Sequence, residues 1–225
     1  WVSSGFGADH LSGLVFDKQS KQLMYKEIHK ISNKQHEVTY QTPEGVVFAR
    51  KIMAFNGASY QPDVDFSNTY CDESYRIQTE EKRVALEYNN RCDKTRKKSA
   101  LKIKQPFVID AGFSDFIFEQ MIKEESKQTD FYYPVPSRAQ WVKMRAKKMP
   151  CNKLKKQIHP YHQTKSIEMQ QCIKVTPTNW LIEQVFPPIF LAFNDQHLTF
   201  FSGRSNMANQ KGNYQNLVIF YSSNQ

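Results

Sequence analysis

The sequence predicts a mainly β (α+β) fold: a strongly curved antiparallel sheet, or open half-barrel, wrapped around one main helix. Short stretches that alternate apolar and polar residues recur along the chain with turn-forming residues between them, which is typical of strands. One stretch, residues 110–127, instead has apolar residues at helical spacing. Its apolar arc is wider than the ~100° stripe of an ordinary surface helix, so we expect a sheet to cover it on more than one side.

The predicted helix runs from Asp110 to Lys127 within the sequence QPFVIDAGFSDFIFEQMIKEESK. Asp110 is its predicted N-cap, because an aspartate carboxylate there can accept hydrogen bonds from the free amides of the first turn. The apolar side chains follow at the i, i+3, i+4, i+8 spacing of one helical face: Phe113, Phe116, Ile117 and Met121.

About ten strands are predicted around this helix, at a spacing typical of a sandwich or barrel. On the second of them the alternation of Leu23 and Tyr25 breaks and resumes at Ile28, while Asn56–Asn68 is rich in turn residues and predicts a surface crossing. We expect one β-rich domain over residues 1–225. Apart from the cysteine hairpins, the predicted strands are Leu11–Asp17, Gln22–Ser32, Glu37–Gln41, Val46–Phe55, Ser99–Lys104, Thr129–Pro136, Trp141–Met149, Ile189–Phe193, Leu198–Ser205 and Tyr214–Tyr221.

Cys71 and Cys92 predict a disulfide across an antiparallel hairpin that turns at Glu81–Lys82. One register pairs apolar residues on the cysteine face and opposite charges on the other face, and a slip by one residue would spoil both. The predicted facing pairs are Tyr75–Tyr88, Ile77–Leu86, Thr79–Val84, Arg76–Glu87, Asp72–Arg91 and Glu80–Arg83.

Cys151 and Cys172 predict a second disulfide-bonded hairpin, with its turn at Tyr161–His162 and Leu154 facing Met169. A set of apolar residues then shares the face opposite the cysteines: Val142, Met144, Ala146, Ile173 and Val175. Two cross-strand disulfides indicate an oxidising compartment, namely the periplasm, the cell surface or secretion. The alternative is four free thiols in a cytosolic protein.

The 31 Lys and Arg exceed the 22 Asp and Glu and give a net charge of +9. A basic surface attracts anionic partners such as phospholipid headgroups, although spread lysines also simply keep a protein soluble. No apolar run is long enough to span a membrane as a helix. The chain begins WVSSGFGADH, which suggests a processed or trimmed product, but a start chosen for expression would look the same.

No motif in the sequence predicts catalysis or a cofactor, so we expect no enzyme; an enzyme with a divergent site is the minor alternative. His159 and His162 near the second cysteine pair fit no zinc-site spacing, and an exposed turn is favoured over a metal site. A group of aromatic and basic residues could stack on single-stranded nucleic acid, but export argues against that partner. The group comprises Tyr132, Tyr133, Arg138, Trp141, Lys143 and Arg145.

Three segments carry a resemblance to a family of uncharacterised exported bacterial proteins: Leu23–Glu27, Pro106–Phe113 and Ser205–Tyr214. That resemblance covers most of the chain and implies no known activity. The strand-rich layout with one wrapped helix is also similar to the lipoprotein-carrier (lipoprotein localisation factor-like) superfamily. This second resemblance implies an open half-barrel of antiparallel strands that holds an acyl chain.

The predicted function is an exported, non-enzymatic binding protein for a hydrophobic or amphipathic ligand, such as a lipid or a lipoprotein acyl chain, without a cofactor. The basic exterior would favour an anionic membrane surface as donor or acceptor. A dry, filled core is the alternative for the interior, and an envelope interaction or assembly factor is the alternative function. The predicted ligand-binding residues, between helix and sheet, are Tyr75, Ile77, Leu86, Tyr88, Phe113, Phe116, Ile117 and Met121.

Overall fold

A computed structural model describes residues 9–158, 160–161, 168–183, 186–195 and 197–223. Its strands fall into two halves. The first half contains β1 (Asp9–Asp17), β2 (Leu23–Ile31), β3 (Gln35–Gln41), β4 (Val47–Ala54), β5 (Asp63–Asn68), β6 (Glu73–Thr79), β7 (Arg83–Asn90) and β8 (Thr95–Lys102). The second half contains β9 (Gln128–Val135), β10 (Gln140–Met149), β11 (Gln171–Pro177), β12 (Ile189–Asn194), β13 (His197–Arg204) and β14 (Asn216–Ser223).

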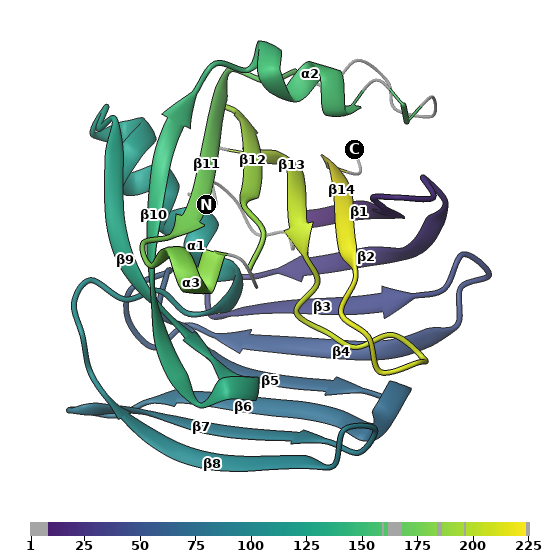
Figure 1. Cartoon of the computed structure of the whole chain (residues 1–225), viewed down its shortest axis with the longest axis vertical. Helices are drawn as coiled ribbons and strands as arrows, with labels where there is room; N and C mark the ends of the chain where they lie inside the picture. The colour runs from purple at the N-terminus through teal and green to yellow at the C-terminus, as the bar shows by residue number, and fades with distance from the viewer. Residues whose placement is uncertain (1–8, 159, 162–167, 184–185, 196, 224–225) are drawn as a thin grey trace.

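These strands form one 14-stranded antiparallel sheet in the order β8-β7-β6-β5-β4-β3-β2-β1-β14-β13-β12-β11-β10-β9. The two halves join where β1 pairs with β14. In Figure 1 the strands of the first half run across the view and most strands of the second half run along it, so the sheet curves over on itself. No ladder joins β8 to β9 in the described part of the chain, and the sheet is therefore open. The predicted fold class, mainly β with a helix, is confirmed.

Backbone and side-chain contacts bridge the two free edges at one point. Residues just after β8 lie along β9, where Val108 N donates to Tyr132 O and Tyr132 N donates to Pro106 O, each at 2.9 Å. The indole Nε1 of Trp141 on β10 donates to the carbonyl of Lys102 at 2.9 Å. These bonds fasten the end of the first half to the second half, beside the helical segment.

The helical segment has three consecutive parts: η2 (Asp110–Gly112), α1 (Phe113–Ile117) and the π-helical η3 (Phe118–Lys123). It ends before the predicted Lys127. Its apolar face is buried, with Ile117 and Met121 at 0% exposure, and it packs in one cluster with Phe131 and Ile173 of the second half.

Asp110 is not the N-cap that the sequence predicts. The residue before α1 is Gly112, and Asp110 lies two residues earlier with a left-handed backbone (φ 47°). Its carboxylate accepts one backbone hydrogen bond, from Ala111 N, and otherwise binds buried side chains of the sheet. A hydrogen bond between a carboxylate and an ammonium is stronger than one between a carboxylate and a neutral amide, which favours the pairing of Asp110 with Lys51.

The segment comes so close to the sheet connection before β5 that Gly112 has no room for a side chain. A Cβ at this position would lie 2.7 Å from Tyr60 Cα and 2.8 Å from its carbonyl atoms. The amide of Ile109 donates to the same Tyr60 carbonyl at 3.0 Å. This backbone contact fixes the start of the helical segment.

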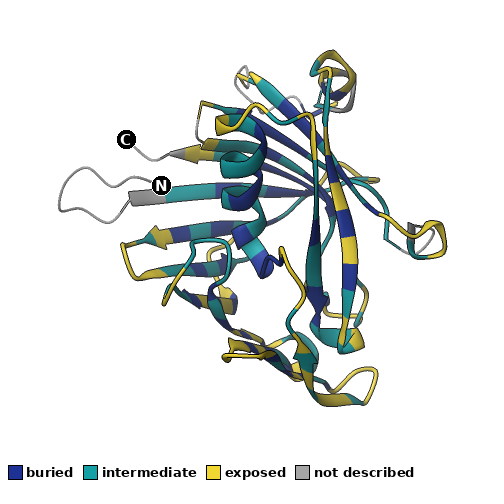
Figure 2. Cartoon of the chain, turned by 90° about the vertical axis from the view of Figure 1, so that its left-hand side faces the viewer, coloured by how far each residue is buried: buried dark blue, intermediate teal, exposed yellow. Residues whose placement is uncertain are grey.

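Both predicted disulfides are present, Cys71–Cys92 and Cys151–Cys172. The predicted register of the first hairpin is confirmed for its strand pairs, and Asp72 and Glu80 form their predicted ion pairs with Arg91 and Arg83. Figure 2 shows buried and exposed residues alternating along strands, as β10 does.

The prediction for the second cysteine hairpin is partly wrong. β10 pairs with β11 so that Met149 faces Cys172, and Cys151 therefore lies beyond the end of the ladder. The chain then forms a helix, α2 (Asn152–Ile158), where the sequence predicts a strand. Leu154 packs in a buried cluster from this helix instead of facing Met169 across a strand pair. The face shared by the apolar residues of β10 and β11 is confirmed, because they pack in a different cluster from Cys172.

Two further predictions need correction. Asn56–Asn68 is not only a crossing: it contains β5, with Val64 and Phe66 buried and polar residues between them. Tyr161 is also buried, where an exposed turn was expected, while His159 and His162 lie outside the described residues. Among the described residues no group of three or more His, Cys, Asp or Glu could hold a metal ion, and no helix is long and apolar enough to cross a membrane.

Candidate ligand-binding cavity

A cavity of about 310 Å³ lies between the two halves of the sheet and the start of the helical segment. This volume is at the lower end of the ~300–1,000 Å³ range of small-molecule sites. Much of its wall is apolar and comes from both halves, for example from Val38, Ile77, Phe131, Val142, Met144 and Leu217.

The antiparallel register places a row of inward-facing side chains across six strands. Directly paired residues point to the same face of a sheet. The pairing runs without a break from β2 to β7: His29, Val38, Lys51, Phe66, Tyr75 and Tyr88. All of these except Phe66 line the cavity.

Tyrosines are concentrated on this wall. The sequence has 11 tyrosines. The ones that line the cavity come from both halves of the sheet: Tyr25, Tyr40, Tyr75, Tyr88, Tyr133, Tyr214 and Tyr221. A tyrosine presents an apolar ring and a polar tip, so the wall can contact a hydrocarbon and also hydrogen-bond a polar group.

A buried ion pair forms the polar centre of the cavity. Lys51 Nζ donates to Asp110 Oδ1 at 2.6 Å, and Tyr75 Oη donates to Asp110 Oδ2 at 2.6 Å. The side chains of Lys51 and Asp110 are only 4% and 5% exposed. Burial and the nearby Asp110 charge raise the pKa of the Tyr75, Tyr40 and Tyr133 phenols, so all three stay protonated as hydrogen-bond donors. We call Lys51, Asp110, Tyr40, Tyr75 and Tyr133 the polar centre.

A second polar group adjoins the first on β2 and β3. Glu27 accepts from Tyr221 Oη at 3.2 Å and lies 3.3 Å from His29 Nε2. His29 Nδ1 lies 2.8 Å from Nε2 of His36. Burial, followed by the nearby charges of His29 and Lys51, lowers the pKa of His36 to about 3, so His36 is neutral near pH 7.

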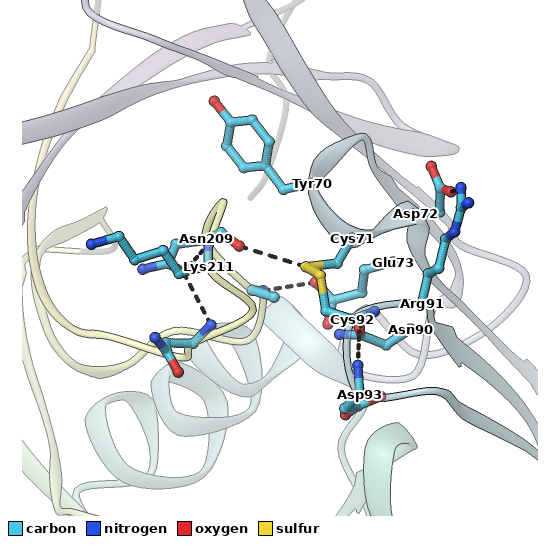
Figure 3. Close-up of a disulfide and its surroundings, with 12 residues drawn as sticks. Tyr70, Cys71, Asp72, Glu73, Asn90, Arg91, Cys92, Asp93, Asn209 and Lys211 are labelled. Atoms are coloured by element: carbon cyan, nitrogen blue, oxygen red, sulfur yellow. Dashed lines mark hydrogen bonds and ion pairs between the residues drawn. A yellow bond between two sulfur atoms is a disulfide. The ribbon is translucent and has the colours of Figure 1, made fainter.

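The Cys71–Cys92 disulfide packs against the loop between β13 and β14 (Figure 3). Cys71 Sγ lies 3.8 Å from the carbonyl oxygen of Asn209, and Cys92 Cβ would lie 3.1 Å from a Cβ at Gly212. Gly212 has a left-handed backbone (φ 78°), which suits glycine. The loop held in this way, residues 205–215 between β13 and β14, brings Ser205, Asn206 and Tyr214 to the cavity wall.

The buried carboxylate of Glu73 fastens the same loop from the inside. It accepts from Tyr214 Oη at 2.5 Å and from the backbone N of Ala208 at 2.7 Å. Tyr88 Oη and the side-chain amide of Asn68 also donate to it, each at 3.2 Å. Glu73 is therefore a shared acceptor for four donors beneath the loop.

A larger hollow of about 450 Å³ lies on the outer face of β5–β8. Its charges pair with one another, as Arg76 does with Asp65 and Lys98 with Glu87. It is a solvent-facing groove between exposed ion pairs, and the largely apolar cavity between the two halves is the better candidate for a ligand site.

The structure brings half of the predicted site residues to the cavity: Tyr75, Ile77, Tyr88 and Phe113. The other half are buried elsewhere. Leu86 packs in the cluster of the first half, and Phe116, Ile117 and Met121 pack in the cluster of the second half. The helical segment thus turns one side to the cavity and another side to a filled core.

Sequence reasoning did not place the titratable and basic members of the site in a ligand cavity: Glu27, His29, Lys51, Asp110, Arg138 and Arg204. A signal for Glu27 and His29 was available. The apparent break in alternation after Tyr25 is not a break, because Tyr25, Glu27 and His29 are buried in turn and Ile28 lies on the other face. Polar residues continue the inward face of β2 there.

No protein-family model matches the chain. No curated protein matches it either. Among solved structures, the chain is similar to a β-barrel-like protein of a domain of unknown function (DUF1849) from Brucella abortus, with a TM-score of 0.44 and 7% sequence identity, over 97% of this chain and 96% of that chain.

Proposed function

We propose that this chain is an exported, non-enzymatic protein that binds a hydrophobic or amphipathic ligand, such as a lipid or a lipoprotein acyl chain, inside the sheet. The observation that carries the proposal is the cavity between the two halves, with apolar residues and tyrosines on its wall. An apolar pocket with a few convergent polar groups is the usual form of a small-molecule site.

The polar centre supports an amphipathic ligand over a purely hydrocarbon one. Charged groups in a protein interior cost free energy unless they are paired, and a filled apolar core would be the simpler way to stabilise a sheet. Here Lys51 and Asp110 are kept beside open space with tyrosine hydroxyls around them. The two disulfides indicate an oxidising compartment, and the periplasm or another exported location is the setting that we propose.

Basic and apolar residues near the cavity support a membrane surface as the source or destination of the ligand. Arg138 and Phe186 both line the cavity, and the guanidinium of Arg138 lies 4.9 Å from the Phe186 ring centroid. The short helix α3 (Trp180–Glu183), a few residues before Phe186, leaves Trp180 67% and Leu181 56% exposed. Exposed aromatic and apolar side chains beside basic ones are typical of peripheral membrane contact.

A cavity-filling variant tests ligand binding. Val142→Phe adds volume on the cavity wall, whereas Ile52→Phe adds the same kind of ring at a position of β4 that is 41% exposed. Native mass spectrometry with lipid extraction, on protein purified from its own compartment, should find a bound lipid in the wild type and in Ile52→Phe but much less in Val142→Phe. Equal lipid occupancy in all three proteins, or none in the wild type, would reject the proposal.

The second candidate is an envelope interaction or assembly factor without a small ligand. The exposed pair Trp180 and Leu181 favours it, because large apolar side chains that lie together on a surface mark contact sites. Cross-linking in intact cells would support this function if one protein partner were lost from a Trp180→Ser/Leu181→Ser variant and retained by Val142→Phe.

A further inference from the structure

The polar centre has unused hydrogen-bond donors that face the cavity. Lys51 is one source of them. A lysine ammonium carries three N–H donors. Within the described part of the chain, Lys51 Nζ has one hydrogen bond, to Asp110 Oδ1, and its side chain is 4% exposed while it lines the cavity.

Two tyrosine hydroxyls add to these donors. Tyr40 on β3 is only 3% exposed and Tyr133 lies on β9, so the two rings come from different halves of the sheet, and both line the cavity. Neither hydroxyl forms a hydrogen bond to another described residue, whereas Tyr75 donates to Asp110 and Tyr221 donates to Glu27. A hydroxyl that faces the cavity without a protein partner can donate a hydrogen bond to an acceptor on a ligand.

The charges around these donors oppose an anionic ligand. Asp110 already neutralises Lys51. Glu27 lies close enough to Tyr40 for its charge, after burial, to raise the pKa of that phenol. At these donors a ligand carboxylate would approach two buried carboxylates and share a single lysine with one of them, and like charges in a protein interior repel strongly. The guanidiniums of Arg138 and Arg204 also line the cavity, where they lie over the Phe186 and Tyr214 rings.

We propose that the polar centre binds the uncharged acyl carbonyl of a single-chain ester or amide, with Lys51, Tyr40 and Tyr133 as the available donors to its carbonyl oxygen. A carbonyl oxygen accepts two hydrogen bonds and brings no charge. The hydrocarbon chain lies along the apolar wall that includes Val142 and Met144. The small cavity suits one chain better than two. This inference rests on the proposed function, because it names the ligand class of the same cavity.

The test compares three probes with the same chain length: methyl laurate, laurate and dodecane. Equilibrium binding to delipidated protein is followed by protein fluorescence. The ester should bind more tightly than the alkane and the anion. Tyr40→Phe/Tyr133→Phe should weaken ester binding by about tenfold, since each lost neutral hydrogen bond costs a few-fold in affinity, and should leave dodecane binding unchanged.

Tyr161→Phe is the matched control, because Tyr161 is 5% exposed and is not part of the cavity wall. It should bind all three probes as the wild type does. The inference is overturned if the double variant keeps wild-type affinity for the ester, or if laurate binds more tightly than methyl laurate. Either result would reject this ligand class but would not contradict the proposed binding function. If none of the three probes binds to the wild type, the proposed binding function is rejected together with the role of the polar centre.

Discussion

The ammonium of Lys51 on β4 lies 2.6 Å from the carboxylate of Asp110 at the start of the helical segment, with both side chains at most 5% exposed. The two residues are 59 positions apart in sequence, and their contact ties the centre of the first half to the element that closes the cavity. A buried pair of this kind is stabilising only while both partners are present.

Asp110→Asn should therefore destabilise the protein by about 3–5 kcal/mol, because it leaves the Lys51 charge buried without its counter-ion. Urea unfolding followed by far-UV circular dichroism measures the change. Asp65→Asn is the control, since the Asp65–Arg76 pair is about half exposed and should contribute at most about 1 kcal/mol. Equal losses in both variants would contradict the assignment of Lys51–Asp110 as a buried pair.

Gly112→Ala should destabilise the protein by about 1–3 kcal/mol, the usual cost of forcing atoms into a well-packed site. The added Cβ meets backbone atoms of Tyr60, which cannot rotate away as a side chain can. Gly57→Ala serves as the comparison, because a Cβ at Gly57 has no heavy atom within 4 Å. The midpoint of thermal unfolding should fall for the first variant and stay almost unchanged for the second.

The two disulfides should contribute similarly to stability but differently to ligand binding. Both join cysteines 21 residues apart, so the chain-entropy estimate of about 3 kcal/mol is the same for each. Only Cys71–Cys92 packs against the loop between β13 and β14 that reaches the cavity.

Cys71→Ser/Cys92→Ser should therefore weaken lipid retention more than Cys151→Ser/Cys172→Ser does at equal loss of stability. Unfolding curves and native mass spectra of the two variants check this. If both variants retain lipid equally, the loop brace has no part in binding.

The free energy of unfolding should decrease as the pH falls from 6.5 towards 3, in part because of His36. Its pKa is about 3 in the folded protein against an ordinary value of 6.5, so between these pH values the unfolded chain binds a proton that the folded chain does not. Stability from this group is present above pH 6.5 and is lost as the pH falls towards 3. At pH 4.5, two units below 6.5, the loss approaches about 3 kcal/mol at the rate of ~1.4 kcal/mol per pH unit.

Asp115 has the opposite effect on stability as the pH changes. Burial raises its pKa from 3.8 to about 6, so its contribution decreases as the pH rises through that window. His36→Gln should consequently lose less stability than the wild type between pH 7 and pH 4.5, as measured by urea midpoints at both pH values. An equal loss of stability in His36→Gln and in the wild type would contradict this role of His36.

The predictable parts of the fold are those in which local pattern and tertiary burial agree. The prediction for the first cysteine hairpin is correct because one register satisfies its apolar pairs, its charge pairs and its disulfide together. β5 was missed because its Asp63, Asp65 and Asn68 read as turn residues when the buried Val64 and Phe66 between them are ignored. α2 was missed because the cysteine spacing predicts that Cys151 faces Cys172, whereas β10 pairs with β11 two residues out of that register and the chain then leaves the ladder as a helix.

The site was less predictable than the fold for a physical reason. Alternation identifies inward positions by assuming that they are apolar, and this cavity keeps charges at inward positions, such as Glu27 and Lys51. Asp110 is similar: its sequence context fits a helix cap, and only the location of Lys51 across the interior shows a different role.

The pairing of β1 with β14 has a consequence for how the chain folds. Every other ladder joins strands that are neighbours in sequence, and the β1–β14 ladder alone joins residues near opposite ends, such as Leu11 and Ser223. Each half can therefore form from hairpins between strands that are neighbours in sequence. The pairing of β1 with β14 then joins the two halves. A chain circularly permuted to start at β9 would run through the whole sheet in sequence order, and we expect it to fold faster because that distant closure becomes a local hairpin.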